Sequence, residues 1–243
     1  MKAIFTGLNG TVAPFAKAYF EEKGYEVIPF KRDEVSTDDK EAMLHFIREV
    51  SPKLIIHFAM GSSDWAASLA EIAKLLKIKF VYISTVSVFS NDNLGPHDIR
   101  SIPDAMDDYG IYKRRCEDAC LAINKDSYIV RLGWQIGYDK GSNQMVDFLY
   151  RKMEIEGVIH ASSKWYPACS FLKDTASALY DIVTNHQPDL YLVDSNDGFN
   201  FFEIVTKLQR LHPSLVVKES TDFKANHRMI DERVKINKLS KIL

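Results

Sequence analysis

A tyrosine and a lysine that could transfer a proton stand four residues apart in the stretch Tyr109-Gly110-Ile111-Tyr112-Lys113. The stretch has helical character, and at that spacing both side chains leave the same face of a helix. A nearby ammonium favours the phenolate, so Lys113 is expected to lower the pKa of Tyr109 from about 10 toward neutrality. Such a phenol protonates a carbonyl oxygen as hydride arrives, or deprotonates an alcohol in the reverse direction. The pair therefore predicts proton transfer in an oxidation or reduction.

The position of this pair in the chain separates it from a chance match. A second copy of the spacing, Tyr19 and Lys23, is interpreted as the outer face of the first predicted helix. Tyr109, in contrast, lies in the helical stretch that follows Thr85, the residue that ends the fourth strand-like run. Ligands of open α/β sheets gather beyond the carboxyl ends of the strands, where the Thr85 hydroxyl could hydrogen-bond the reacting oxygen. We therefore expect Thr85, Tyr109 and Lys113 to act together.

A glycine-rich turn with the sequence GLNGTVA, residues 7–13, follows the first strand-like run and opens the first helix. Gly7 and Gly10 would let the backbone turn tightly and approach a pyrophosphate, which the helix N-terminus attracts with about half a positive charge. Ala13 stands where a third small residue allows close packing of helix on sheet. A purely structural turn would also explain the motif, but its place at the first strand–helix junction favours dinucleotide binding.

The end of the second strand-like run bears on the choice of dinucleotide. An acidic residue there usually holds the adenosine ribose of NAD, whereas an arginine accommodates the 2′-phosphate of NADP. Here Lys31 and Arg32 come first and Asp33 follows. The two basic residues favour NADP(H), Asp33 keeps NAD(H) possible, and solvated loop charges remain the alternative interpretation.

The chain up to Trp134 alternates short apolar runs with longer helical patterns, which predicts the elements that position these groups. The expected strands are 3–6, 25–30, 54–58, 80–84 and 128–132. The expected helices are 12–23, 38–50, 65–77 and 103–124. Runs that are apolar along their whole length are typical of parallel strands buried on both faces. The pattern predicts an α/β fold of the Rossmann type, a doubly wound parallel sheet.

After Trp134 this alternation loosens, which predicts a small C-terminal substrate lobe. The expected elements are helices at 143–153, 174–184, 201–211 and 234–242, a loop at 161–165, and strands at 190–193 and 215–217. We assign residues 1–134 with 174–195 to the dinucleotide-binding domain. Residues 135–173 with 196–243 are assigned to the substrate-binding lobe.

Composition excludes several classes of protein. The 31 Lys and Arg residues against 33 Asp and Glu give a net charge of −2, so we expect no nucleic-acid binding through phosphate neutralisation. No apolar stretch approaches the roughly 18 residues of a membrane span, so a cytoplasmic protein without a membrane partner is expected. Three cysteines (Cys116, Cys120 and Cys169) are interpreted as free thiols, and no spacing of His and Cys predicts a metal site.

These features resemble the extended short-chain dehydrogenases/reductases, and among them the dTDP-4-dehydrorhamnose reductase and NAD-dependent epimerase/dehydratase families. The resemblance covers most of the chain and rests on the motifs Gly7-x-x-Gly10-x-x-Ala13, IIHFA at 55–59, YIST at 82–85 with VF at 88–89, Tyr109-Gly110-x-x-Lys113 and Arg131-x-x-Trp134-x-x-Gly137. It implies a catalytic triad of Thr85, Tyr109 and Lys113, with Lys113 also holding the nicotinamide ribose. Cofactor contacts are expected from Gly7, Asn9, Gly10, Thr11, Val12, Lys31, Arg32, Phe58, Ala59, Met60, Tyr109 and Lys113.

The chain departs from those reductases in three places. Residues 84–89 read STVSVF where the family has STDYVF, so an acidic and an aromatic partner are missing. The segment 60–66 is shorter than in the family by a turn of helix or more. The helix in this region commonly builds the family's homodimer, so the shortening argues against the usual dimer contact. At the C-terminus only Arg228 and the run at 235–239 survive of the family pattern.

The resemblance implies an NADP(H)-preferring oxidoreductase acting on a keto or hydroxyl carbon of a nucleotide sugar. An NAD-dependent nucleotide-sugar epimerase or dehydratase is the alternative of the same class. A non-catalytic dinucleotide-binding regulatory partner protein is the alternative of another class. A homodimer is possible.

Overall fold

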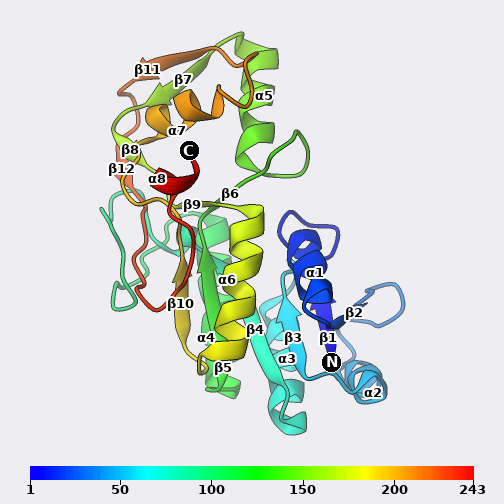
Figure 1. Cartoon of the computed structure of the whole chain (residues 1–243). Helices are drawn as coiled ribbons and strands as arrows, with labels where there is room; N and C mark the ends of the chain where they lie inside the picture. Colours follow the sequence, from blue (N-terminus) through cyan, green and yellow to red (C-terminus); the bar gives the residue numbers. More distant parts are fainter.

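The computed structural model describes residues 1–243 and contains a central sheet of six parallel strands (Figure 1). The order across the sheet is β10-β5-β4-β3-β1-β2. The strands are β1 (Lys2–Thr6), β2 (Glu26–Pro29), β3 (Leu54–His57), β4 (Lys79–Thr85), β5 (Ser127–Leu132) and β10 (Leu190–Val193). The Rossmann-type fold predicted from the sequence is confirmed, and all five strands expected before Trp134 are present.

Helices cover both faces of this sheet. One face carries α1 (Ala13–Glu22) and α6 (Leu172–Asn185), which contact each other, and the other carries α2 (Lys40–Val50), α3 (Ser63–Leu76) and α4 (Asp108–Ile123). Strand residues such as Ile4 and Phe5 therefore point alternately into two separate hydrophobic cores, one under each helix layer. This double burial explains why the strands are apolar on both sides.

The chain changes direction across the sheet between β1 and β3. From β1 it steps to β2 at one edge, then returns to β3 and continues through β4 and β5 to β10 at the other edge. The chain after β1 consequently leads to α1 on one face of the sheet and the chain after β3 to α3 on the other. Ligands of such sheets bind at the carboxyl end where this reversal occurs. In Figure 1 this end of the sheet faces the second lobe.

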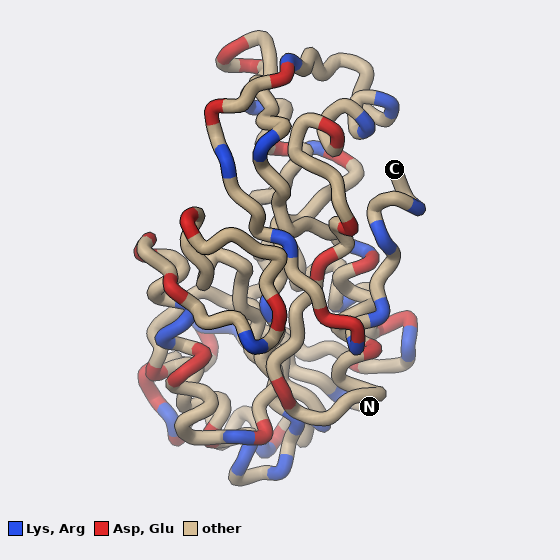
Figure 2. Tube along the Cα trace, turned by 90° about the vertical axis from the view of Figure 1, so that its left-hand side faces the viewer, with Lys and Arg blue, Asp and Glu red and all other residues tan.

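The second lobe packs α5 (Met145–Glu156) and α7 (Phe201–Leu208) against short parallel strand pairs. Three such pairs join distant segments: β6 (Trp134–Ile136) with β9 (Cys169–Phe171), β7 (Ile159–Ser162) with β11 (Val217–Ser220), and β8 (Trp165–Tyr166) with β12 (Ala225–Asn226). The lobe has its own core of 14 buried residues, built around both helices. Acidic and basic residues alternate over both lobes, so neither sign of charge gathers on one of them (Figure 2).

Two local predictions are wrong. The loop expected at 161–165 contains the end of β7 and the start of β8, because both strands pair with segments far along the chain, which no local pattern indicates. The terminal helix expected at 234–242 is confined to α8 (Leu239–Ile242). The preceding residues form a turn at 231–234 against the sheet, where the Asp231 carboxylate accepts hydrogen bonds from the Leu192 amide at 3.3 Å and the Arg233 guanidinium at 2.9 Å.

The burial of this segment shows that part of the predicted lobe packs on the sheet. Val234 is buried in the sheet core beside Val183 and Tyr191, and Met229 packs against Leu192 of β10. Part of the range 196–243 thus lies on the sheet rather than in the lobe. The boundaries given above remain a proposal.

Candidate active site

A cavity of about 420 Å³ opens at the carboxyl end of the sheet, between the two lobes. Its size is within the usual range for small-molecule sites, about 300–1,000 Å³. Its wall is formed by the segments that follow β1 and β3, the ends of β4 and β5, the starts of α1, α4 and β6, and a loop of the second lobe. The lining residues are Gly7, Gly10, Thr11, Val12, Ala13, Phe58, Met60, Ile83, Ser84, Thr85, Val86, Ser87, Tyr109, Lys113, Leu132, Gly133, Trp134, Gln135 and Asn143.

The glycine turn forms one wall of this cavity and leaves room for a ligand against its backbone. Gly7 has a φ of +71°, and a Cβ there would lie 2.8 Å from the Ala59 amide nitrogen. The Gly10 amide donates to the Gly7 carbonyl at 2.8 Å, which closes the turn directly before α1. Val12 at the helix N-cap supplies no capping side chain, and Pro14 has no amide hydrogen, so the amides of Ala13 and Phe15 in the first turn of α1 stay free for an anion. These features fit the pyrophosphate of a dinucleotide.

Some of the other expected cofactor residues line the cavity, one is buried behind its wall, and three are exposed outside it. Phe58 and Met60 line the cavity, and so does Thr11, whose hydroxyl lies 2.7 Å from that of Ser142 in the second lobe. Ala59 is buried behind Gly7, and its amide donates to the Thr6 hydroxyl at 3.0 Å. Asn9 is exposed outside the lining, as are Lys31 and Arg32.

The side chains of Lys31 and Arg32 have different contact partners. The Lys31 ammonium pairs with the Glu34 carboxylate at 2.6 Å and is engaged on the surface. The Arg32 guanidinium lies 3.4 Å from the Met60 carbonyl and 5.8 Å from the centre of the Trp65 ring. Of these two cations, only Arg32 contacts a residue that lines the cavity.

A close approach of α4 to the end of β4 brings Tyr109 and Thr85 together. The Asp107 carboxylate accepts the Gly110 amide at 2.9 Å and starts the helix there, later in the chain than the sequence predicts. Any Cβ on Gly110 would collide with the Ser87 carbonyl, so only glycine lets the first turn of α4 reach the 3-10 turn at Val86–Val88 that follows β4. The half-exposed Tyr109 phenol is thereby brought near the Thr85 hydroxyl, and both residues line the cavity.

Lys113 is buried, and its ammonium donates to the Ile83 carbonyl of β4 at 2.9 Å. Burial lowers the pKa of Lys113 to about 8. The expectation that Lys113 lowers the pKa of Tyr109 is wrong for this structure: burial raises the pKa of Tyr109, and the nearby Thr85 hydroxyl offsets only part of that rise. The reason is geometric, because the ammonium points at the strand and lies over the Tyr82 ring, 4.9 Å from its centre.

Tyr109 and Lys113 are the titratable side chains of the lining, which contains no aspartate, glutamate, histidine or cysteine. A phenol that keeps its proton at neutral pH can donate it to an oxygen held beside Thr85. The site is therefore equipped for one proton transfer at one oxygen.

Sequence reasoning missed five polar or aromatic residues of the lining: Ser84, Ser87, Trp134, Gln135 and Asn143. Ser87 was visible only as a departure from the family pattern after Thr85. Trp134 and Gln135 follow the fifth strand, whose carboxyl end was a signal for them. Asn143 reaches the cavity from a loop of the second lobe, and its place depends on tertiary packing that no local motif indicates.

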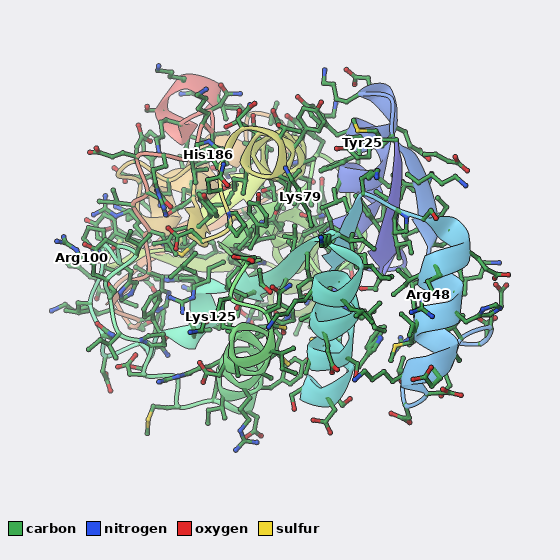
Figure 3. The ribbon with its side chains drawn as sticks, turned by 90° about the horizontal axis from the view of Figure 1, so that it is seen from below. Tyr25, Arg48, Lys79, Arg100, Lys125 and His186 are labelled. Carbon is green, nitrogen blue, oxygen red and sulfur yellow. The ribbon has the colours of Figure 1, made fainter.

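A second cavity, of about 440 Å³, opens at the amino end of the sheet (Figure 3, near Lys79 and His186). Lys74, Lys77 and Lys79 contribute to its lining. The C-terminal ends of α3, α4 and α6 surround it, and lysine ammoniums bind carbonyls there: Lys74 binds Ile123 at 2.8 Å and Lys79 binds Val183 at 2.6 Å. Helix C-termini repel anions and attract these cations. The lysines here stabilise helix ends.

The remaining expectations concern buried groups and membrane spans. Cys116, Cys120 and Cys169 are free and buried, as predicted. His57 is enclosed beside Thr6, and burial lowers its pKa to about 3, so it stays neutral. None of the helices is long and apolar enough to cross a membrane.

Solved structures with this fold include several enzymes of nucleotide-sugar metabolism. A dTDP-4-dehydrorhamnose reductase from Bacillus anthracis, in complex with NADP, matches with a TM-score of 0.79 at 21% identity, over 94% of this chain and 88% of that chain. An orthologous reductase from Clostridium acetobutylicum matches with a TM-score of 0.81 at 19% identity, over 96% and 91%. A dTDP-glucose 4,6-dehydratase from Bacillus anthracis, in complex with NAD, gives 0.76 at 18% identity, over 96% and 88%.

Comparison of the sequence with models of protein families identifies the family of this chain. No curated protein matches the chain significantly in sequence. The family model described as the RmlD substrate binding domain matches residues 62–189, which is more than half of the chain. This range includes Thr85, Tyr109 and Lys113. The chain therefore belongs to the RmlD substrate binding domain family, within the extended short-chain dehydrogenases/reductases.

Proposed function

We propose that this protein is an NADP(H)-preferring oxidoreductase that acts on a keto or hydroxyl carbon of a nucleotide sugar. The observation that carries the proposal is a single cavity that unites the glycine turn with Thr85, Tyr109 and Lys113. The fold alone would not support an activity, since one fold hosts many functions. The arrangement of these groups around one space does.

Each residue has a defined task in this proposal. The Thr85 hydroxyl holds the oxygen of the reacting carbon, and Tyr109 gives that oxygen a proton during reduction or takes it during oxidation. Lys113, protonated below its pKa of about 8, keeps a positive charge near the phenolate that reduction leaves. A bound nicotinamide dinucleotide would supply or accept the hydride.

The residue types in the lining favour a reductase over a dehydratase. Dehydration of a sugar requires a base for a carbon-bound proton and an acid for the departing hydroxyl, in addition to the group that serves the carbonyl oxygen. Val86 and Ser87 stand directly after Thr85, and neither can fill those roles. An epimerase needs only the groups present, so it remains the second candidate; it would convert substrate without net oxidation of the cofactor.

The preference for NADP(H) rests on Arg32. Its guanidinium forms no ion pair with a carboxylate and lies 3.4 Å from the carbonyl of Met60, a residue of the cavity lining, whereas Lys31 is paired with Glu34. A guanidinium is suited to hold a phosphate by two parallel hydrogen bonds. The reductase from Bacillus anthracis was solved with NADP and the dehydratase with NAD, so both dinucleotides occur among proteins of this fold.

The nucleotide part of the substrate is proposed from the second lobe. A hollow of about 310 Å³ lies there, and its wall combines charged and polar residues with four aromatic side chains: Phe148, Trp165, Phe201 and Phe223. Phe148 and Phe223 are both partly exposed. Exposed aromatic faces in a concave site suit stacking of a nucleobase.

The test is a binding and turnover assay with the purified chain. NADPH and NADH are titrated by fluorescence, and cofactor oxidation is then followed with dTDP-4-dehydrorhamnose and other 4-keto nucleotide sugars. Oxidation of NADPH by one of these sugars, faster than that of NADH, is expected. Dinucleotide binding with no turnover of any sugar would overturn the oxidoreductase and favour a non-catalytic partner protein. Conversion of sugar with no net oxidation would indicate an epimerase.

A further inference from the structure

A small hollow adjoins the main cavity at the turn that follows Thr85. It has a volume of about 160 Å³, and Val86 and Ser87 line both this hollow and the main cavity. Met106, Asp107 and His227 also contribute to its wall. With about 30 Å³ for each water molecule, the hollow has room for roughly five water-sized groups. A substrate held at Thr85 and Tyr109 can extend into it past Ser87.

The backbone around His227 is held on both sides. The His227 amide donates to the Tyr166 carbonyl at 2.8 Å, and on the opposite side the Gly95 amide donates to the Asn226 carbonyl at 2.7 Å. The ring itself lies among aromatic side chains, 6.3 Å from Trp165 and 6.4 Å from Phe223 between ring centres. His227 therefore has a fixed place in the wall of the hollow.

The proton of the His227 ring is fixed as well. The Trp165 indole Nε1–H, which can only donate, points at His227 Nδ1 at 3.0 Å. Nδ1 must therefore accept, and a neutral ring carries its proton on Nε2. Burial lowers the pKa of His227, which keeps the ring neutral at pH 7.

The Nε2–H of His227 has no partner within the protein. The enclosed and unsatisfied histidine nitrogens are the Nε2 atoms of His57, His97 and His212, and that of His227 is not among them. It is thus a free donor that a ligand can reach. A neutral donor matches an uncharged acceptor, such as the hydroxyl, ring or carbonyl oxygen of a sugar.

We propose that His227 determines substrate specificity: its Nε2–H donates to an oxygen of the sugar portion that enters the hollow beyond Ser87. The inference rests on the proposed function, because it assumes a sugar bound at Thr85 and Tyr109. It assigns a substrate contact to the C-terminal segment, which is distant in sequence from both of these groups.

Two substitutions of His227 distinguish the role of Nδ1 as an acceptor from the role of Nε2 as a donor. In His227→Asn the side-chain oxygen can still accept the Trp165 indole, but no donor remains at the Nε2 position. In His227→Gln the longer amide carries an N–H close to that position. His45→Leu on the exposed outer face of α2 serves as the control for loss of a histidine.

The measurement is the KM and kcat for dTDP-4-dehydrorhamnose with NADPH, together with the Kd for NADPH. We expect His227→Asn to raise KM about tenfold or more, with the Kd for NADPH unchanged, because one hydrogen bond to substrate is lost. His227→Gln and His45→Leu should stay within about threefold of the unsubstituted protein, a change worth less than a typical hydrogen bond.

An unchanged KM in His227→Asn, or an equal rise in both His227 variants, would overturn the specificity role while the proposed function stands. Lack of turnover by the unsubstituted protein with every sugar would overturn the proposed function and this inference with it.

Discussion

The two ends of the central sheet carry cavities of nearly equal size, about 420 Å³ at the carboxyl end and 440 Å³ at the amino end. Only the first has the parts of an active site. Its wall includes the N-terminus of α1 with free amides and a tyrosine whose proton can be transferred. The other is surrounded by helix C-termini whose carbonyls bind lysines.

Volume and local charge therefore do not identify a site in this fold. Three lysines line the amino-end cavity, more than the carboxyl-end cavity contains, yet two of them bind carbonyls of neighbouring helices. In a parallel sheet every strand ends on the same side, so helix N-termini collect there and helix C-termini collect on the opposite side. The direction of the chain decides which cavity can receive an anionic cofactor.

The largest expected effect at the carboxyl end follows from removal of the Tyr109 hydroxyl. Tyr109→Phe should lower kcat about 10²–10⁴-fold, the usual contribution of a positioned acid or base. The Kd for NADPH should change little, because the ring and the glycine turn remain. Stopped-flow oxidation of NADPH measures the first quantity and fluorescence titration the second. Activity within threefold of the unsubstituted protein would rule out Tyr109 as the proton donor.

A smaller loss is expected when the glycine turn is filled. Gly7→Ala should weaken NADPH binding roughly 10–100-fold, because the new Cβ meets the Ala59 backbone and φ is positive. The matched control is Gly24→Ala, which has a φ of +87° but no atom within 4 Å of the added Cβ. The control should lose thermal stability with no change in Kd. Equal Kd changes in the two variants would show that Gly7→Ala weakens binding through backbone strain alone, and not because Gly7 lies at the dinucleotide site.

Cofactor choice is expected to respond to one of the two adjacent cations. Arg32→Ala should reduce the preference for NADPH over NADH about tenfold, the value of one charge-assisted contact. Lys31→Ala should leave the preference unchanged, because the Lys31 ammonium is already paired with Glu34. The ratio of the two Kd values gives the result. A shift in Lys31→Ala that equals the shift in Arg32→Ala would contradict the role given to Arg32.

The smallest expected effects are changes in the free energy of unfolding. Replacing a lysine is expected to raise it at the carboxyl end of the sheet and to lower it at the amino end. Because the pKa of folded Lys113 is about 8, below its ordinary 10.5, the buried charge destabilises the fold below pH 8. This penalty disappears as the pH rises from about 8 to above 10.5. Lys113→Met should therefore raise the free energy of unfolding at pH 7 by about 1–3 kcal/mol while abolishing activity. Its advantage over the unsubstituted protein should shrink toward pH 10.

At the amino end, Lys79→Met removes the bond to the Val183 carbonyl and should lower stability by about 1 kcal/mol with full activity. Urea unfolding at pH 7 and pH 10 measures both variants. A destabilised Lys113→Met, or an inactive Lys79→Met, would contradict the division of roles between the two ends.

Much of this site could be predicted from the sequence because its main signals are local. A glycine turn directly after a strand and a tyrosine four residues before a lysine both show in a short window, and the fold brings Gly7, Thr85, Tyr109 and Lys113 to one cavity. The six-stranded sheet was predictable for the same reason, since its strands are short apolar runs. The catalytic roles of these residues stay a prediction.

The rest depended on contacts between distant segments. The direction of the Lys113 ammonium is set by the Ile83 carbonyl, which no spacing indicates. The strands β7 and β8 pair with segments far along the chain, and Asn143 reaches the cavity from the other lobe. His227 could not be found at all, because its neighbour Trp165 precedes it by 62 residues.

The most direct test of the proposed activity is hydride transfer at the carboxyl end of the sheet. The protein is incubated with dTDP-4-dehydrorhamnose and NADPH that carries deuterium at both hydrogen positions of nicotinamide C4, and the sugar product is analysed by mass spectrometry. We predict one deuterium on the carbon that bore the carbonyl in the unsubstituted protein, and none above background in Tyr109→Phe. A reduced sugar without deuterium, or equal labelling by Tyr109→Phe, would contradict hydride transfer assisted by Tyr109.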